Sequence, residues 1–130
     1  MTHPTNRGKK ILLVDDEPSV SKSIKMLLEH EGFKVQIAEN GKEALALYEQ
    51  DRFDLVITDF SMPGMTGGEL AVRIKKLRPN QPIILATASI YLIDQAISPV
   101  RLVDGVLDKP FSLQDLREAI ARIDFSKNSD

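Results

Sequence analysis

Short, continuous apolar runs recur along the chain, and segments with a helical spacing of apolar residues separate them. The runs cover residues 11–14, 35–38, 55–58, 83–86 and, more weakly, 105–107. A short unbroken apolar run is typical of a strand that is buried on both faces of a parallel sheet. The pattern therefore predicts five buried strands, each followed by a crossover to the next.

The intervening segments repeat apolar residues every three or four positions, which predicts amphipathic helices. These residues are Val20, Ile24, Leu27 and Leu28; Ala44, Leu45, Leu47 and Tyr48; Leu70, Ile74 and Leu77; and Leu113, Leu116, Ile120 and Ile123. Pro18 is suited to open the first helix and Gly32 to close it, while the Ser112 to Asp115 segment resembles a helix cap. The fourth crossover is less regular: residues 90–97 suit a short helix, which Pro99 should stop, leaving residues 100–104 as loop.

Alternating strands and helices predict an α/β protein with right-handed crossovers and helices on both faces of one doubly wound parallel sheet. We expect one domain over residues 10–125, a flexible N-terminal segment over residues 1–9 and a flexible C-terminal tail over residues 126–130.

Composition narrows the possible functions. Apolar residues make up 42% and charged residues 28% of the 130 positions, and the net charge of -2 gives no basic excess for direct binding of nucleic acid or an anionic membrane. The chain has no cysteine, which excludes disulfides and cysteine-ligated zinc. No apolar run approaches the roughly 20 residues that span a bilayer. We expect a cytoplasmic protein.

Polar side chains follow the predicted strands at the point where each strand ends. Asp15 and Asp16 follow the first strand, Asp59 the third, Thr87 the fourth and Lys109 the fifth. Since ligands bind beyond the carboxyl ends of parallel strands, these groups should converge. Clustered carboxylates favour a hard divalent cation such as Mg²⁺, and an added ammonium and hydroxyl suit a phosphoryl group. Asp59 ends the strand expected at the centre and is the best candidate nucleophile.

Each of these residues also has a purely structural interpretation. The Asp pair could form a turn or a helix cap, Thr87 is a good strand residue, and Lys109 could be a solvated turn charge. For each residue considered alone, the structural interpretation is preferable to a functional one. Complementary groups at four strand ends in chain order are hard to explain by packing, and their joint placement favours a functional site.

Four motifs with matching spacing carry a family resemblance over residues 10–125. They are Leu-Leu-Val-Asp-Asp-Glu-Pro at residues 12–18, Ile-Thr-Asp-Phe-Ser-Met-Pro-Gly-Met-Thr-Gly at residues 57–67, Leu-Ala-Thr-Ala at residues 85–88 and Asp-Lys-Pro-Phe at residues 108–111. With these motifs the sequence resembles the receiver domain of two-component response regulators. The resemblance implies a flavodoxin-like, five-stranded (βα)5 sheet of strand order 2-1-3-4-5.

The resemblance also implies the chemistry. Asp59 would accept a phosphoryl group from a phosphohistidine on a sensor histidine kinase or a phosphotransfer protein. Asp16, Asp59 and the backbone carbonyl of Ser61 would bind Mg²⁺, and Asp15 would assist through water. Such a protein is not an enzyme acting on other substrates; it catalyses only its own phosphorylation and dephosphorylation.

The same resemblance assigns the phosphoryl contacts to residues at the fourth and fifth strand ends. Thr87 and the backbone amide of Ala88 would bind phosphoryl oxygens, and Lys109 would pair with the phosphoryl group. In the family the bond between this lysine and the following proline, here Pro110, is typically cis. The phosphorylated form should shift conformation and signal to an effector, with a homodimer left open as a further assembly.

One position departs from the family pattern. Many receivers carry Tyr or Phe three residues before the lysine, whereas this chain has Val106. An aromatic rotamer switch is therefore impossible there, and Tyr91 or the apolar residues 90–97 are the alternative output elements.

Two other functions compete with the receiver hypothesis. A docking module would have the same fold without phosphorylation, but the intact Asp15, Asp16, Asp59, Thr87 and Lys109 argue against it. An aspartate-nucleophile phosphatase usually has a second Asp two positions after the nucleophile, where this chain has Ser61. The phosphate-binding pattern Gly-x-x-x-x-Gly-Lys-Ser/Thr does not occur, which excludes a P-loop enzyme.

Overall fold

A computed structural model describes residues 7–88 and 103–128 of the chain. Its five strands form one sheet in which every neighbouring pair is parallel, in the order β2-β1-β3-β4-β5. The strands are β1 (Lys10–Val14), β2 (Lys34–Ala38), β3 (Leu55–Asp59), β4 (Ile83–Thr87) and β5 (Gly105–Asp108). The predicted fold class and strand order are confirmed.

The helices lie where the apolar spacing predicts them. They are α1 (Pro18–His30), α2 (Gly41–Gln50), α3 (Gly67–Leu77) and α6 (Leu113–Ala121), followed by the 3-10 helix η2 (Phe125–Asn128). Pro18 opens α1, and Gly32 follows its end with a φ of 104°, a value that favours glycine. The predicted short helix at residues 90–97 and the Pro99 stop lie outside the described residues.

Two capping boxes fix helix starts. At α6, Ser112 Oγ accepts from the Asp115 amide at 3.0 Å, and Asp115 Oδ2 accepts from the Ser112 amide at 3.0 Å. Thr66 and Glu69 make the same reciprocal pair at α3. Each box satisfies two amides that a helix start leaves without a partner. The α3 box matters for the site, because it holds the loop that connects β3 to α3.

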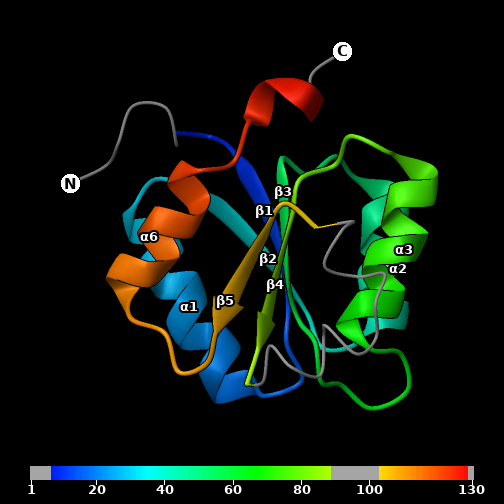
Figure 1. Ribbon diagram of the computed structural model, residues 1–130, viewed down its shortest axis with the longest axis horizontal. Helices are drawn as coiled ribbons and strands as arrows, with labels where there is room; N and C mark the ends of the chain where they lie inside the picture. Colours follow the sequence, from blue (N-terminus) through cyan, green and yellow to red (C-terminus); the bar gives the residue numbers. More distant parts are fainter. Residues whose placement is uncertain (1–6, 89–102, 129–130) are drawn as a thin grey trace.

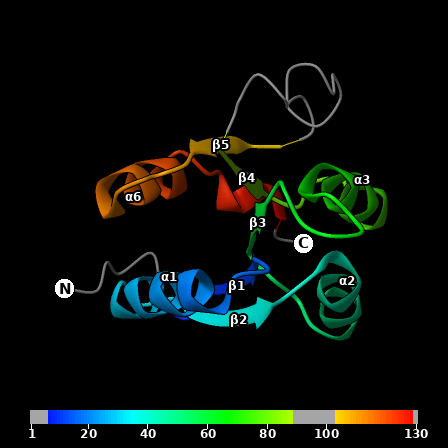
Figure 2. The same ribbon diagram turned by 90° about the horizontal axis from the view of Figure 1, so that it is seen from below.

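The helices form two layers around the sheet. In both views α1 and α6 lie on one side of the strands, and α2 and α3 lie on the other (Figures 1 and 2). Alternate strand residues divide the core accordingly: Ile11 and Leu13 face α1 and α6, whereas Leu12 and Val14 face α2 and α3. Both faces of β1 are therefore buried, as its unbroken apolar run predicts.

The layered arrangement leaves the carboxyl ends of the strands open at one edge of the sheet. The arrowheads of β4 and β5 mark this edge in Figure 1. The ends of β1, β3, β4 and β5 lie at this edge, and the polar residues singled out above are at or directly after these strand ends. Among the described residues, no helix has the length and apolar character that crossing a membrane requires.

Candidate phosphoacceptor and metal site

Asp59 is the last residue of β3, the middle strand of the sheet, and its neighbours are the ends of β1 and β4. In register, Thr58 lies beside Val14, and Asp59 lies beside Ala86. The Phe60 amide donates to the Ala86 carbonyl at 2.8 Å, which extends the ladder one residue past Asp59. The Asp59 side chain is only 7% exposed. A carboxyl group is thus held nearly buried at the centre of the strand-end edge.

Three acidic residues in succession follow β1. One carboxylate oxygen from each of Asp15, Asp16 and Glu17 lies within 4.8 Å of the other two. Asp15 is buried, and its Oδ1 accepts from the Glu17 amide at 2.9 Å, so the turn after β1 is held by its own carboxylate. Sequence reasoning selected Asp15 and Asp16 but missed Glu17, although the uninterrupted acidic run Asp-Asp-Glu was the available signal.

The Lys109 ammonium contacts both Asp59 and Asp15, the first residue after β1. Its Nζ lies 3.0 Å from Asp59 Oδ1 and 3.7 Å from Asp15 Oδ2. The Lys109 amide donates to the Thr87 carbonyl at 2.7 Å, which joins the loop after β5 to the end of β4. The bond between Lys109 and Pro110 is cis, as the family resemblance implied. One ammonium thus faces two nearly buried carboxylates.

Burial and neighbouring charges shift the pKa values of both Asp59 and Lys109 upward. Burial raises the pKa of Asp59, an effect that Lys109 only partly offsets and that the charges of Asp15 and Asp16 reinforce. Burial favours the neutral amine of Lys109, but the hydrogen bond and charge of Asp59, with Asp15 and Glu17, outweigh it and raise the pKa of Lys109. At Asp59 burial, reinforced by Asp15 and Asp16, outweighs Lys109, and at Lys109 the acids outweigh burial, so both pKa values rise.

The remaining predicted residues lie at the same edge. Thr87 ends β4 and is 1% exposed, while Ala88 follows it and is exposed. Ser61 is exposed in the loop between β3 and α3. The Gly67 amide donates to the Phe60 carbonyl at 2.8 Å, so this loop returns directly to the end of β3. The fold therefore brings Asp15, Asp59 and Lys109 into contact and places Ser61, Thr87 and Ala88 around them.

The donor set at this edge suits a hard divalent cation. Mg²⁺ binds through carboxylate and carbonyl oxygens and retains several waters. The cluster supplies the carboxylates of Asp15, Asp16 and Glu17, with that of Asp59 close by and the Lys109 ammonium facing them. Burial, with the charges of Asp15 and Asp16, raises the pKa of Asp59 and so disfavours its charged form, which a bound dication would stabilise.

A groove runs from this site along α1. Its volume is about 730 Å³, and Glu17, Ala88 and Lys109 form the end nearest the acids. The rest of its wall is mostly apolar and comes from α1 and from the start of α6, including Val20, Ile24, Leu27, Phe111, Leu113 and Leu116. Leu27, one of these lining residues, is 40% exposed. An apolar surface therefore adjoins the phosphoacceptor edge.

Val106 is half-buried on β5, where the family pattern has an aromatic residue. It lines a hollow of about 280 Å³ together with Asp108, Asp115 and other residues of β5 and α6. A valine side chain has no ring to change between inward and outward rotamers. Tyr91 and residues 90–97, the alternative output elements, lie outside the described residues.

A comparison with protein-family models settles the family. The model of the response regulator receiver domain matches residues 11–121, which include Asp15, Asp16, Asp59 and Lys109. The chain belongs to the response regulator receiver domain family. It is therefore a receiver domain of the two-component signalling type, and the expected family membership is confirmed.

Relatives of this receiver domain include both short and long proteins. It is 39% identical over 118 residues to the chemotaxis protein CheY of Pseudomonas aeruginosa, covering 88% of this chain and 94% of CheY. It is 33% identical to the transcriptional regulatory protein TrcR of Mycobacterium tuberculosis and 36% identical to GlrR of Escherichia coli, over 82% and 89% of this chain. The chain spans only 42% and 26% of the length of these two regulators.

Solved structures show the same fold. The response regulator TrrA of Thermotoga maritima, in complex with Mg²⁺-BeF, matches with a TM-score of 0.81 at 37% identity, over 88% of this chain and 97% of TrrA. TrrA in complex with the histidine kinase ThkA matches with a TM-score of 0.78 at 38% identity, over 88% of this chain and 97% of that chain. A response regulator receiver domain protein from Methanospirillum hungatei matches with a TM-score of 0.81 at 37% identity, over 88% of this chain and 91% of that chain.

Proposed function

We propose that Asp59 accepts a phosphoryl group from a phosphohistidine on a sensor histidine kinase or a phosphotransfer protein. A carboxylate oxygen of Asp59 forms a bond to phosphorus as the phosphorus–nitrogen bond of the donor breaks. The electron pair of that bond returns to the imidazole nitrogen, and the product is an acyl phosphate on Asp59. The 3.0 Å contact between Lys109 Nζ and Asp59 Oδ1, within a nearly buried acidic cluster, is the observation that supports this function most strongly.

The side chains around Asp59 would have separate roles in the phosphoryl transfer. Lys109 already faces the nucleophile and would neutralise charge on a phosphoryl oxygen, since a preorganised cation in a partly buried site stabilises developing charge. The Thr87 hydroxyl and the Ala88 amide would donate to other phosphoryl oxygens. Asp16, Asp59 and the Ser61 carbonyl would hold Mg²⁺, with Asp15 acting through water and Glu17 at the rim. When bound, Mg²⁺ supplies charge neutralisation and orientation of the phosphoryl oxygens.

We infer that the donor protein docks along the groove beside α1. The groove ends at Lys109 and Ala88, so a protein lying in it would present a side chain directly to Asp59. The exposed Leu27, which lines the groove, provides apolar area for such a contact. A histidine kinase as partner is supported by the TrrA structure, which was solved as a complex with the kinase ThkA. The absence of cysteine fits a reducing compartment, and we propose the cytoplasm.

The phosphoacceptor assignment is tested by intact mass after incubation with acetyl phosphate and Mg²⁺. The wild type should gain one phosphoryl group, and Asp59→Asn should gain none. Asp108→Asn is the matched control, because Asp108 is an exposed carboxylate at the end of β5, a strand that is not paired with β3, and has no role in the proposed chemistry. Loss of the mass increase in Asp108→Asn but not in Asp59→Asn would disprove the assignment.

The same experiment separates two competing functions. A docking module that has lost phosphorylation would show no mass increase in any variant. A phosphatase would turn over a phosphate ester such as p-nitrophenyl phosphate, but the position two residues after Asp59 is the exposed Ser61 rather than a general acid. We propose that the domain acts on no substrate other than its own acyl phosphate.

Signalling would follow from a conformational shift of the β4 and β5 ends, either to an effector domain of a longer protein or to a separate partner. The contact between the Lys109 amide and the Thr87 carbonyl couples these two ends. Because Val106 cannot make an aromatic rotamer change, the shift should appear in the backbone. Beryllofluoride should move the amide NMR signals between Thr87 and Val106, and unchanged signals would rule out switching through this face.

A further inference from the structure

The Met65 side chain, in the loop between β3 and α3, lies against the start of α2. Gly41 is the first residue of α2, and a Cβ built on it would lie 2.6 Å from Met65 Sδ, 3.1 Å from Met65 Cγ and 3.0 Å from Met65 Cβ. Met62 of the same loop is buried in the apolar cluster on this face of the sheet, and Met65 packs against that cluster. The stem of Met65 thus occupies space that a residue other than glycine would fill with its own Cβ.

Backbone hydrogen bonds fix both ends of this loop. At its beginning the Phe60 amide donates to the Ala86 carbonyl, and at its end the Gly67 amide donates to the Phe60 carbonyl, each at 2.8 Å. Ser61, whose backbone carbonyl is a proposed Mg²⁺ ligand, lies between these bonds and is exposed. The packing of Met65 therefore acts on the interior of the loop, where the proposed ligand lies.

The start of α2 is in turn connected to the acids that follow β1. The Asp15 amide donates to the carbonyl of Ala38, the last residue of β2, at 3.1 Å. Two residues separate Ala38 from Gly41, and the second of them, Asn40, caps α2 with its side chain. The turn after β1 and the loop that contains Ser61 are thus connected through the short segment between β2 and α2.

We propose that Met65 is a positioning residue for the metal site, because its packing on Gly41 sets the distance between the Ser61 carbonyl and the acids that follow β1. This inference rests on the proposed Mg²⁺ site. Mg²⁺ requires near-ideal octahedral geometry with ligands at about 2.0–2.1 Å, so a displaced loop binds it more weakly. A methyl group at Gly41 causes such a displacement. Rotation about χ1 moves Sδ and Cγ of Met65, but Cβ moves only with the backbone of the loop.

The dissociation constant of Mg²⁺ tests this role, measured from the amide NMR signals of the residues that follow β1. Gly41→Ala should weaken Mg²⁺ binding about tenfold, since the loss of a contact behind a metal ligand typically costs that much or more. Met65→Ala should also weaken binding, because the loop loses the contact. In the Met65→Ala background, Gly41→Ala should have a smaller effect than in the wild type, because its closest contact, with Sδ, is gone. Independent effects of the two substitutions would overturn the proposal.

Two control variants separate positioning from a general loss of stability. Gly105→Ala adds the same methyl group at the first residue of β5, where it would make an ordinary contact. Tyr48→Phe removes the buried hydrogen bond from Tyr48 to Gln81, in the last turn of α2 and away from Gly41. Both variants should bind Mg²⁺ as tightly as the wild type, whatever their Tm. If Tyr48→Phe weakened Mg²⁺ binding as much as Gly41→Ala, lost stability would explain the effect and the positioning role would be wrong.

The wild type distinguishes failure of this inference from failure of the proposed function. If the wild type binds Mg²⁺ and Gly41→Ala binds it equally tightly, the positioning role is wrong and the metal site stands. If Mg²⁺ causes no saturable shift in the wild type, the proposed metal site is itself wrong, and the positioning role with it. If Gly41→Ala fails to fold, Met65→Ala still decides, because it only removes atoms; binding as tight as that of the wild type would contradict the proposal.

Discussion

Gly67 is the position where a single methyl group should disturb both the fold and the phosphoacceptor. It is the first residue of α3, and a Cβ built there would lie 2.2 Å from the Asp59 carbonyl oxygen and 2.9 Å from the Asp59 carbonyl carbon. It would also lie 2.9 Å from Leu85 Cδ1, a side chain that is fully buried. Real Cβ atoms essentially never come closer than 3.0 Å to such neighbours. Gly67→Ala must therefore push α3 away from the end of β3.

The free-energy cost of Gly67→Ala depends on whether the atoms around the new methyl group can move aside. The nearest atoms are backbone atoms of the central strand, which cannot rotate aside as a flexible side chain could. Overpacking a tight core costs about 1–3 kcal/mol, and the upper part of that range is expected here. For a domain of this size, 1 kcal/mol lowers Tm by roughly 4 °C, so Gly67→Ala should lower Tm by about 8–12 °C. Phosphorylation by acetyl phosphate should also slow, because the loop that carries Ser61 connects Asp59 to Gly67.

Gly105→Ala is the matched control. Gly105 is likewise the first residue of its element, the strand β5, but its Cβ would meet only Ile84 Cγ1 at 3.4 Å, an ordinary contact. At such a position alanine is tolerated or stabilises by about 0.4–1 kcal/mol through the unfolded chain. Thermal unfolding followed by circular dichroism measures both variants. If Gly67→Ala were as stable as Gly105→Ala, the close approach of α3 to Asp59 described here would be wrong.

Three further changes test other parts of the structure. Burial raises the pKa of Asp59 above its ordinary value of 3.8, so the contribution of this group to stability is fully present below pH 3.8 and is lost as the pH rises through the folded-state pKa. In urea unfolding, Asp59→Asn should therefore be more stable than the wild type at pH 7, and the difference should shrink in acid. A variant that is less stable than the wild type at pH 7 would contradict the direction of the pKa shift. Tyr48 Oη donates to Gln81 Oε1 at 2.7 Å inside the core, so Tyr48→Phe should cost about 1–3 kcal/mol in the same assay, and an unchanged midpoint would mean that the bond is not made. Leu27→Lys on the proposed docking groove should slow phosphoryl transfer from the cognate kinase at least about tenfold while leaving the reaction with acetyl phosphate unchanged, because small donors need no docking surface; equal loss with both donors would argue against docking there.

The fold could be predicted in most respects from the sequence, because strong local patterns agree with the tertiary structure. The runs at β1, β3 and β4 are continuous because these strands are buried on both faces, and the strand-end residues converge because all five strands are parallel. Strand order was not determined by the apolar pattern and came from the family motifs. The cap formed by Ser112 and Asp115 was visible as a local spacing.

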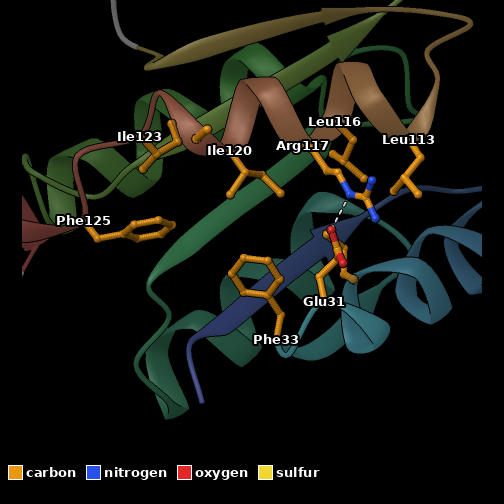
Figure 3. A pocket seen from close by; sticks show the side chains of 10 residues that line it. Glu31, Phe33, Leu113, Leu116, Arg117, Ile120, Ile123 and Phe125 are labelled. Atoms are coloured by element: carbon orange, nitrogen blue, oxygen red, sulfur yellow. Dashed lines mark hydrogen bonds and ion pairs between the residues drawn. The ribbon is translucent and has the colours of Figure 1, made fainter. Parts of the chain in front are cut away.

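The finer features of the site depend on contacts between distant segments and left no local signal. Nothing in the sequence around Gly67 shows that its backbone touches Asp59, since that approach is set by how α3 packs on the sheet. The contact of Lys109 with both Asp15 and Asp59 likewise depends on the loop after β5. A cavity beside Glu31 lies where the end of α1, Phe33, α6 and the C-terminal segment meet (Figure 3). Glu17 differs from these features, because it directly follows Asp15 and Asp16 and could have been selected from the sequence.

The central claim is that the phosphoryl group is carried by the carboxylate of Asp59. Borohydride reduction of the protein phosphorylated by acetyl phosphate and Mg²⁺ converts an aspartyl phosphate into homoserine, and peptide mass spectrometry then locates that residue. The account predicts homoserine at position 59 in the wild type and none in Asp59→Asn. Homoserine at position 15 or 16, or a phosphoryl group that resists borohydride, would contradict it.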